Sequence, residues 1–384
     1  MSTNTAAHSI NPLRGFLPST DPLNRLPKPF DAWEEAASGL PKLLASDHTR
    51  KTLASLPPFP IEDIADARQR ERAMTLLSYL GHAYVWRGDK PAHLLPNRIA
   101  APWHAVAQSL GRPPVLSYSS YSLHNYYRFD PSREIECGNI GLIQNFLGGI
   151  DEEWFILIHV DIERQAGPGL AALHPCLDAT DPEELEQHLK TVHASIEAMY
   201  AGLARMTEWC DPYIYYHRVR PYIHGWKNHP DLSNGVIYEG LYDGQPQHFR
   251  GETGAQSAII PSLDAMLGIG HKEDFLRAYL MEMRTYMPPA HRVFIESLEA
   301  RGSIRPFVEK TNLAGLTSVY NACVEGVERF RSLHLEYAAK YIFRQAQTDA
   351  KNPHAVGTGG TPFMPYLTKH RDETAQHKLP ESAK

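Results

Sequence analysis

The sequence has few cysteines, no long apolar run and no long run of basic residues. Its four cysteines, Cys137, Cys176, Cys210 and Cys323, lie far apart and form no CxxC pair. We therefore expect free thiols in a reducing, cytoplasmic environment rather than a disulfide framework or a zinc cage. No uninterrupted apolar stretch reaches the ~18 residues of a membrane span. The opening MSTNTAAHSINPLRG has no basic segment followed by an apolar one, so we expect no secretory signal.

The net charge is modest, and the basic residues are spread along the chain. The net charge is −6, and the 38 basic residues are scattered along the chain without forming a basic run. This argues against nucleic acid or an anionic membrane as a partner. With 384 residues and 42% hydrophobic residues, the chain can form one large domain or two smaller ones, each with a full core.

Apolar periodicity predicts a mainly helical chain. The clearest segment begins at Asp181, a suitable N-cap, followed by Pro182 and an acidic first turn. Apolar residues then recur four and three positions apart as far as Met206, which predicts one buried stripe. A bundle helix fits this segment better than a coiled coil. Further helices are expected at 30–46, 62–90, 98–110, 214–226, 255–269, 272–285, 289–300 and 312–346.

Strand signals are confined to the middle of the chain. Two β-rich runs, 139–147 and 154–162, are separated by GGIDEE and are predicted to form a hairpin. The segment 116–129 is ambiguous between strand and helix, and the polar, Gly/Pro-rich segment 347–362 is predicted to be a loop. The predicted fold is mainly α. It has a small α/β-containing N-terminal domain with a short hairpin (1–145) and a large helical domain (146–384).

His334 is the most informative single residue. It lies in RSLHLEYAAKYI (331–342), where a helix would place Phe330, Tyr337 and Tyr341 on the same side. A neutral imidazole on a dry helical face is what one axial bond to haem iron requires. The chain has 20 histidines, however, and a lone histidine on an apolar face is usually an ordinary core residue.

A second group of histidines does not predict a metal site. His217, His224 and His229 are close in sequence, but Pro221 interrupts the helix between the first two. His229 then falls off the shared face, so zinc spacing is not met.

Several motifs accompany His334 and define a resemblance. They are YYHRVRPYIHGWKNHPDLSNGVIYEGLYDG (215–244), FRGETGAQSAIIPSLDAMLGI (249–269), MRTYMPPAHRVFIESLE (283–299) and GTGGT (357–361). In this order, together with RSLHLEYAAKYI, they resemble the indoleamine 2,3-dioxygenase family, most plainly between residues 110 and 367. The resemblance implies a helical oxidoreductase that binds haem b between packed helices. It also implies O2 as co-substrate and an external electron donor that keeps the iron ferrous.

The resemblance also assigns residues around the haem. His334 matches the proximal ligand of the iron and is the implied metal-binding residue. Arg331 matches an arginine near a haem propionate, and Asp264 matches its acidic partner. The loop over the haem is matched by small residues that let the backbone come close, and these are Thr253, Gly254 and Ala255.

On the substrate side, Arg220 matches the residue that clamps the substrate carboxylate. We prefer it to Arg218 because its distance from Gly225 and Trp226 fits the family. Tyr215 and Tyr216 stand where the family has two phenylalanines, so this pocket is expected to be more polar.

The remaining pocket residues come from two other segments. The wall around the indole benzo ring is matched by Tyr118, Tyr121 and Ser122, of which the last two depart from the family toward polarity. Thr358, Gly359 and Gly360 match a mobile loop that closes over the substrate ammonium group.

The implied reaction opens the indole 2,3-bond of L-tryptophan or a related indoleamine to an N-formylkynurenine-type product, as in tryptophan catabolism by the kynurenine pathway. No protein general base is required, and the distal segments contain no obvious acid/base residue. Two alternatives stay open: a haem-dependent oxygenase of a different indole in secondary metabolism, and a non-catalytic haem-binding sensor. Arg220 argues against a gas sensor, which needs no carboxylate clamp.

Overall fold

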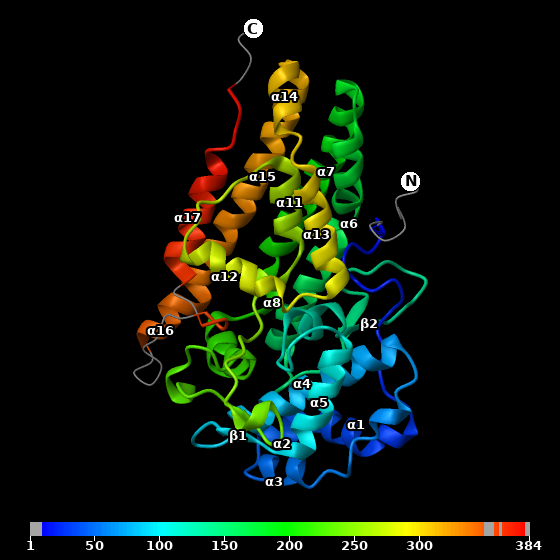
Figure 1. Ribbon diagram of the computed structural model, residues 1–384, viewed down its shortest axis with the longest axis vertical. Coiled ribbons are helices and arrows are strands. Elements are labelled where there is room, and N and C mark those ends of the chain that lie inside the picture. The colour runs from blue at the N-terminus through cyan, green and yellow to red at the C-terminus, as the bar shows by residue number, and fades with distance from the viewer. Residues whose placement is uncertain (1–9, 349–356, 361–362, 381–384) are drawn as a thin grey trace.

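The computed structural model describes residues 10–348, 357–360 and 363–380, and it is mainly α-helical, as predicted (Figure 1). The N-terminal helices are α1 (Asp31–Ser38), α2 (Leu40–Leu44), α3 (Thr49–Ala54), α4 (Ala67–Trp86) and α5 (Asn97–Ser109). The middle of the chain forms α6 (Ile150–Asp178), α7 (Pro182–Ala204), α8 (Met206–Trp209), α9 (Pro212–Ile214) and α10 (Arg220–Ile223). The rest forms α11 (Ile259–Leu267), α12 (Phe275–Arg284), α13 (Pro289–Arg301), α14 (Arg305–Thr311), α15 (Ala314–Ala338), α16 (Arg344–Thr348) and α17 (Phe363–Ala375).

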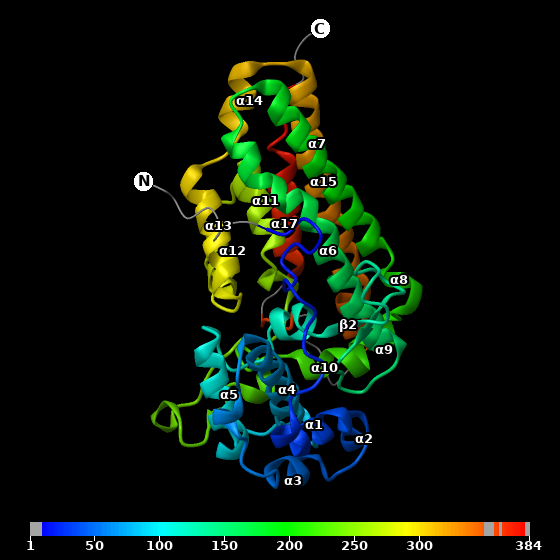
Figure 2. The ribbon, with the colours of Figure 1, turned by 90° about the vertical axis from the view of Figure 1, so that its right-hand side faces the viewer.

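The predicted helix after Asp181 is confirmed as α7. The Asp181 side chain accepts a hydrogen bond from the backbone N–H of Glu184 at 3.2 Å, which caps the helix. The apolar stripe of α7 is buried against α6 and α15. These three helices run side by side through the upper part of the molecule, as Figure 2 shows, so α7 is a bundle helix.

The two sheets are very small. Strand β1 (Leu94–Leu95) pairs in parallel with β4 (Ile237–Tyr238), and β2 (Tyr126–Arg128) pairs antiparallel with β3 (Ile140–Leu142). The ambiguous segment 116–129 therefore contains both kinds of structure, because a π-helical turn at Ser119–Leu123 precedes β2.

The predicted hairpin is wrong in its second half. The run 154–162 lies inside α6, and β3, within the first run, pairs instead with β2. Ile156, Leu157 and Ile158 are all buried, but each belongs to a different apolar cluster. A helix with apolar neighbours on several sides has an unbroken apolar sequence, which cannot be distinguished from a buried strand by periodicity.

Most of the apolar core lies in two clusters. The lower one combines helices α1–α5 with segments 223–238 and 276–286, and the upper one combines α6, α7, α11, α13 and α15. The division into domains 1–145 and 146–384 stays a prediction. The four cysteines are free, as expected, and three of them are buried. Among the described residues, no helix is both long enough and apolar enough to cross a membrane.

Candidate functional site

A cavity of about 340 Å³ is lined by residues from both apolar clusters. Helices α6, α7, α11, α12, α15 and α17 and the loop 252–257 contribute to its wall. Much of this wall is apolar, with side chains such as Phe155, Ile162, Leu203, Met206, Ile260 and Phe330. The cavity is therefore a mostly apolar site between packed helices, the kind of site that suits a large flat cofactor.

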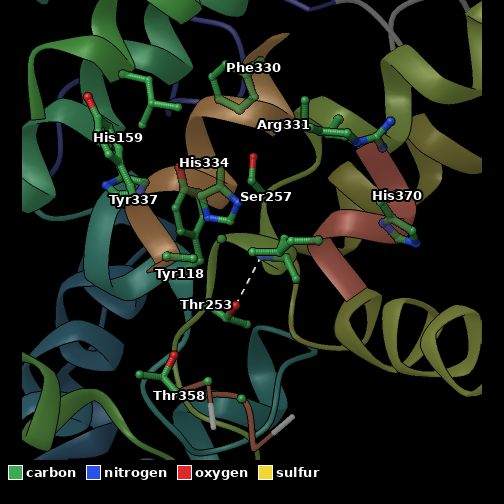
Figure 3. A pocket seen from close by; sticks show the side chains of 18 of the residues that line it. Tyr118, His159, Thr253, Ser257, Phe330, Arg331, His334, Tyr337, Thr358 and His370 are labelled. Carbon is green, nitrogen blue, oxygen red and sulfur yellow. Dashed lines mark hydrogen bonds between the residues drawn. The ribbon is translucent and has the colours of Figure 1, made fainter. Parts of the chain in front are cut away.

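His334 projects into this cavity from α15 (Figure 3). Its side chain is exposed to the cavity, yet protein surrounds the imidazole closely enough that burial lowers its pKa to about 4. Neither ring nitrogen has a hydrogen-bond partner among the described residues. A neutral imidazole with a lone pair open to the cavity is the protein ligand that a haem iron requires.

One end of the cavity is polar. Arg331 donates to the Asp264 carboxylate at 2.6 Å and also to the Thr374 hydroxyl. Burial opposes the charge on Asp264, but Arg331 and His271 outweigh this effect and lower the pKa of Asp264. The predicted pairing of Arg331 with Asp264 is thus present at the edge of the cavity.

Two histidines extend this polar end. The rings of His271 and His370 stack with centroids 4.1 Å apart, and His271 bonds Glu373 at 2.8 Å. The Nε2 atom of His370 is buried without a partner among the described residues. A guanidinium and an unpaired imidazole nitrogen at one end of an apolar cavity fit the propionate edge of a haem.

The loop over the cavity is fixed by a backbone junction. Gly225 and Gly251 approach so closely that a Cβ on Gly225 would lie 2.1 Å from the Gly251 nitrogen, so both positions require glycine. The Trp226 N–H donates to the Phe249 carbonyl at 2.8 Å. This junction brings the segment that carries Arg220 next to the loop that carries Thr253.

The described part of the GTGGT segment, 357–360, is docked on this junction. The Thr358 hydroxyl donates to the Glu252 carbonyl, and Arg250 donates to the Gly359 carbonyl. Asn228 donates to the Gly360 carbonyl at 3.1 Å. Residues 349–356 and 361–362 of the predicted loop lie outside the described residues.

The structure brings together most of the residues predicted for the site. The cavity is lined by Tyr118, Tyr215, Thr253, Gly254, Ala255, Asp264, Arg331, His334 and Thr358. The residues that are not part of the described lining are Tyr121, Ser122, Tyr216 and Arg220. Each of these four is buried.

Arg220 lies directly behind the aromatic wall. Its guanidinium carbon is 5.3 Å from the ring centroid of Tyr216, and its side chain is 1% exposed. Tyr215 and Tyr216 begin a π-helical turn, Tyr215–Val219, which leads into α10. Such turns re-aim side chains and are frequent at functional sites. Arg218, two residues earlier, is exposed.

Two titratable residues of the cavity were missed by the sequence analysis. His159 on α6 and Glu252 in the loop both line it, so the prediction that the distal segments contain no acid/base residue is wrong. His159 lies four residues after Phe155 and therefore on the same face of α6, but the sequence pattern predicts a strand in this segment. Glu252 stands in the GETGAQS motif, in which only the small residues carry the resemblance to the family.

Glu163 stabilises the cavity wall through hydrogen bonds. It accepts hydrogen bonds from the Tyr118 hydroxyl at 2.9 Å and from the Ser257 hydroxyl at 2.7 Å. Burial raises its pKa to about 7, although both hydroxyl donors oppose this rise. The phenol of Tyr118 is therefore held in one orientation at the cavity surface.

An apolar cavity between helices, with a neutral histidine on its wall and an arginine at its polar end, has the features expected of a helical haem protein. The protein family described as Indoleamine 2,3-dioxygenase matches residues 4–377. The chain is 35% identical to rat indoleamine 2,3-dioxygenase 1, covering 93% of this chain and 92% of the relative. It is 33% identical to human indoleamine 2,3-dioxygenase 2, covering 97% and 95%. It is also 32% identical to indoleamine 2,3-dioxygenase acdA of Aspergillus candidus, covering 96% and 95%.

The chain therefore belongs to the indoleamine 2,3-dioxygenase family. Members of this family are haem-dependent dioxygenases that use O2, and the protein is an oxidoreductase of this type. The resemblance stated from the motifs is confirmed.

Proposed function

We propose that the protein opens the 2,3-bond of the indole ring of L-tryptophan, or of a closely related indoleamine, and releases an N-formylkynurenine-type product. The observation that supports this most is a single cavity that combines the neutral His334 with the aromatic residues Tyr118 and Tyr215. Haem, when bound to His334, supplies the activation of dioxygen, whose two atoms both enter the product. An external electron donor, a cytoplasmic location and a place in the kynurenine pathway belong to the same proposal.

The protein's own residues position the substrate. We assign the substrate carboxylate to Arg220, because a guanidinium can form two charge-assisted hydrogen bonds to it. Since Arg220 is buried outside the described lining of the cavity, this contact requires the wall beside it to move when substrate binds. Thr253, Gly254, Ala255 and Thr358 form the roof against which the amino acid portion lies. Tyr121 and Ser122 support the wall next to Tyr118.

His159 holds the indole ring in register. Its Nδ1 atom lies 2.7 Å from the Phe155 carbonyl oxygen, which can only accept, so Nδ1 carries the proton. Burial lowers the pKa of His159, which keeps the ring neutral and leaves Nε2 as an acceptor. We infer that Nε2 accepts the indole N–H.

The test is a product screen by mass spectrometry. Reduced holo-protein is supplied with isotopically labelled dioxygen and a panel of indoles. The expected product of L-tryptophan contains two labelled oxygen atoms and has the mass of N-formylkynurenine. A product with one labelled atom, or none from any indole, would contradict the proposal.

A different indole is the second candidate, and buried hydroxyls favour it. The hydroxyl groups of Tyr121 and Ser122 are buried without a hydrogen-bond partner among the described residues. Such groups are costly to bury unpaired. Neither residue lines the cavity, so an indole with an additional polar substituent would satisfy them only after the wall beside Tyr118 shifts. The same screen distinguishes the two candidates by which indole is consumed fastest.

The tyrosines at 215 and 216 are expected to weaken tryptophan binding. Replacing both by phenylalanine removes polar groups near the indole, and a change of ~1 kcal/mol corresponds to about a fivefold lower KM for L-tryptophan. Steady-state kinetics at fixed O2 measure this effect. Tyr213→Phe is the control, because Tyr213 is on the same segment but 59% exposed. Unchanged kinetics in the double variant would count against tyrosine hydroxyls in the substrate pocket.

A further inference from the structure

Glu252 is a cavity residue that none of the roles above uses. Its side chain is 4% exposed, and it lines the cavity beside Thr253. Neither carboxylate oxygen has a hydrogen-bond partner among the described residues. Burial raises its pKa to about 8. An unpaired buried carboxyl group is costly, and a cationic ligand would remove that cost.

Two other buried glutamates accept hydrogen bonds from the protein, although Oε2 of Glu163 has no partner among the described residues. Glu152 accepts the backbone N–H groups of Phe146, Leu147 and Gly148. Glu163 accepts two hydroxyl groups, as described above. Glu252 differs from both because its carboxylate has no donor from the described protein and faces the cavity.

The backbone holds Glu252 in a defined position. Its N–H donates to the Ile223 carbonyl at 3.2 Å, and its own carbonyl accepts the Thr358 hydroxyl. The neighbouring Gly251 is packed against Gly225. The backbone of Glu252 is thus fixed between the α10 segment, which carries Arg220, and the docked turn 357–360, so ligand binding does not have to order this part of the loop.

Arg220 and Glu252 act on the same wall residue with opposite sign. The pKa of the Tyr215 phenol is raised mainly by burial, while Arg220 lowers it and Glu252 raises it. The Gly225–Gly251 junction joins the two segments that carry these residues, so a buried cation and a buried carboxyl group come from neighbouring segments. Opposite charges on neighbouring segments are complementary to a zwitterion, whose carboxylate and ammonium are bonded to the same carbon.

Resting on the proposed function, we propose that Glu252 receives the protonated α-amino group of the substrate while Arg220 takes its carboxylate. The site then selects zwitterionic indole amino acids over indoles that lack the amine. Thr358 contributes indirectly, because its hydroxyl fixes the backbone of Glu252 when the turn is docked.

The test compares three ligands on two forms of the haem-loaded protein. Glu252→Gln keeps the size of the side chain and removes the charge. Binding of L-tryptophan, tryptamine and indole-3-propionate to the ferric holo-protein is measured by calorimetry, which does not depend on turnover. The Soret band and far-ultraviolet circular dichroism verify that the variant is folded and loaded.

We expect Glu252→Gln to weaken binding of L-tryptophan and tryptamine about 10- to 100-fold, as for the loss of one charge-assisted hydrogen bond. Binding of indole-3-propionate should be unchanged or tighter, since it has no amine. Equal weakening of all three ligands, or unchanged binding of tryptamine, would overturn the proposal. If the variant does not fold, the wild-type protein still decides: tighter binding of indole-3-propionate than of L-tryptophan would refute an amine site.

Failure of the proposed function gives a different result. If no indole yields a dioxygenated product but L-tryptophan still binds through Glu252, the amine site is supported and the proposed reaction is contradicted. If product forms from L-tryptophan and the Glu252→Gln variant binds all three ligands as the wild type does, the reaction is supported and the amine site is contradicted.

Discussion

Replacing His334 by alanine is expected to abolish stable haem binding. His334 is the residue we assign as the axial ligand, and its neutral imidazole has no partner among the described residues. The Soret absorbance per chain, after reconstitution with haem and gel filtration, should fall to a small fraction of that of the wild type. Dioxygenase activity should be lost with it.

The control for this variant is His159→Ala. His159 lines the same cavity and lies on α6 instead of α15, so its removal should leave haem content close to that of the wild type. Full haem occupancy with an unchanged spectrum in His334→Ala would refute the axial assignment. Loss of haem in His159→Ala but not in His334→Ala would indicate that the iron ligand is His159 on α6.

Replacing Arg220 by alanine should raise the KM for L-tryptophan by about 10- to 100-fold. A charge-assisted hydrogen bond to the carboxylate contributes ~1.5–3 kcal/mol in such a site, and ~1.4 kcal/mol corresponds to a factor of ten. Haem content and CO binding by the ferrous protein should be nearly unchanged. Arg220→Lys should fall between, because an ammonium cannot form the paired contacts of a guanidinium.

Arg218→Ala is the matched control. Arg218 is exposed, whereas the Arg220 side chain is 1% exposed behind Tyr216, so its loss should change KM far less. A larger effect for Arg218 would show that the two arginines were assigned the wrong roles. No effect for either variant would indicate a substrate without a carboxylate.

The long helices could be predicted because each had a local signal. The α7 helix has an N-cap at Asp181 and one apolar stripe, and both features depend only on spacing along the chain. The pairing of β2 with β3 could not be predicted in this way. Its partner strands are three residues long, and the run 154–162 offered a longer and more apolar alternative.

The residues of the candidate site could likewise be predicted only where a local motif indicated them. The family motifs gave His334, Arg331 and Asp264, and the structure places all three at one cavity. His159 was missed because the error at 154–162 removed its helical face. Glu252 was missed because nothing in GETGAQS indicates whether its glutamate points to solvent or into a cavity. That distinction depends on the Gly225–Gly251 junction, which joins segments distant in sequence.

Because the cavity lies between two apolar clusters, we expect the stability of the folded chain to depend on bound haem. A ligand that binds only the folded chain adds RT ln(1 + [L]/Kd) to the free energy of unfolding, ~4 kcal/mol at a thousandfold excess over Kd. Haem bound at His334 would contact side chains of both clusters, so its departure exposes apolar surface on each. Newly synthesised chains without haem would unfold more often and would be degraded by proteases first. The amount of this protein in a cell would then follow the supply of haem as well as the rate of its synthesis.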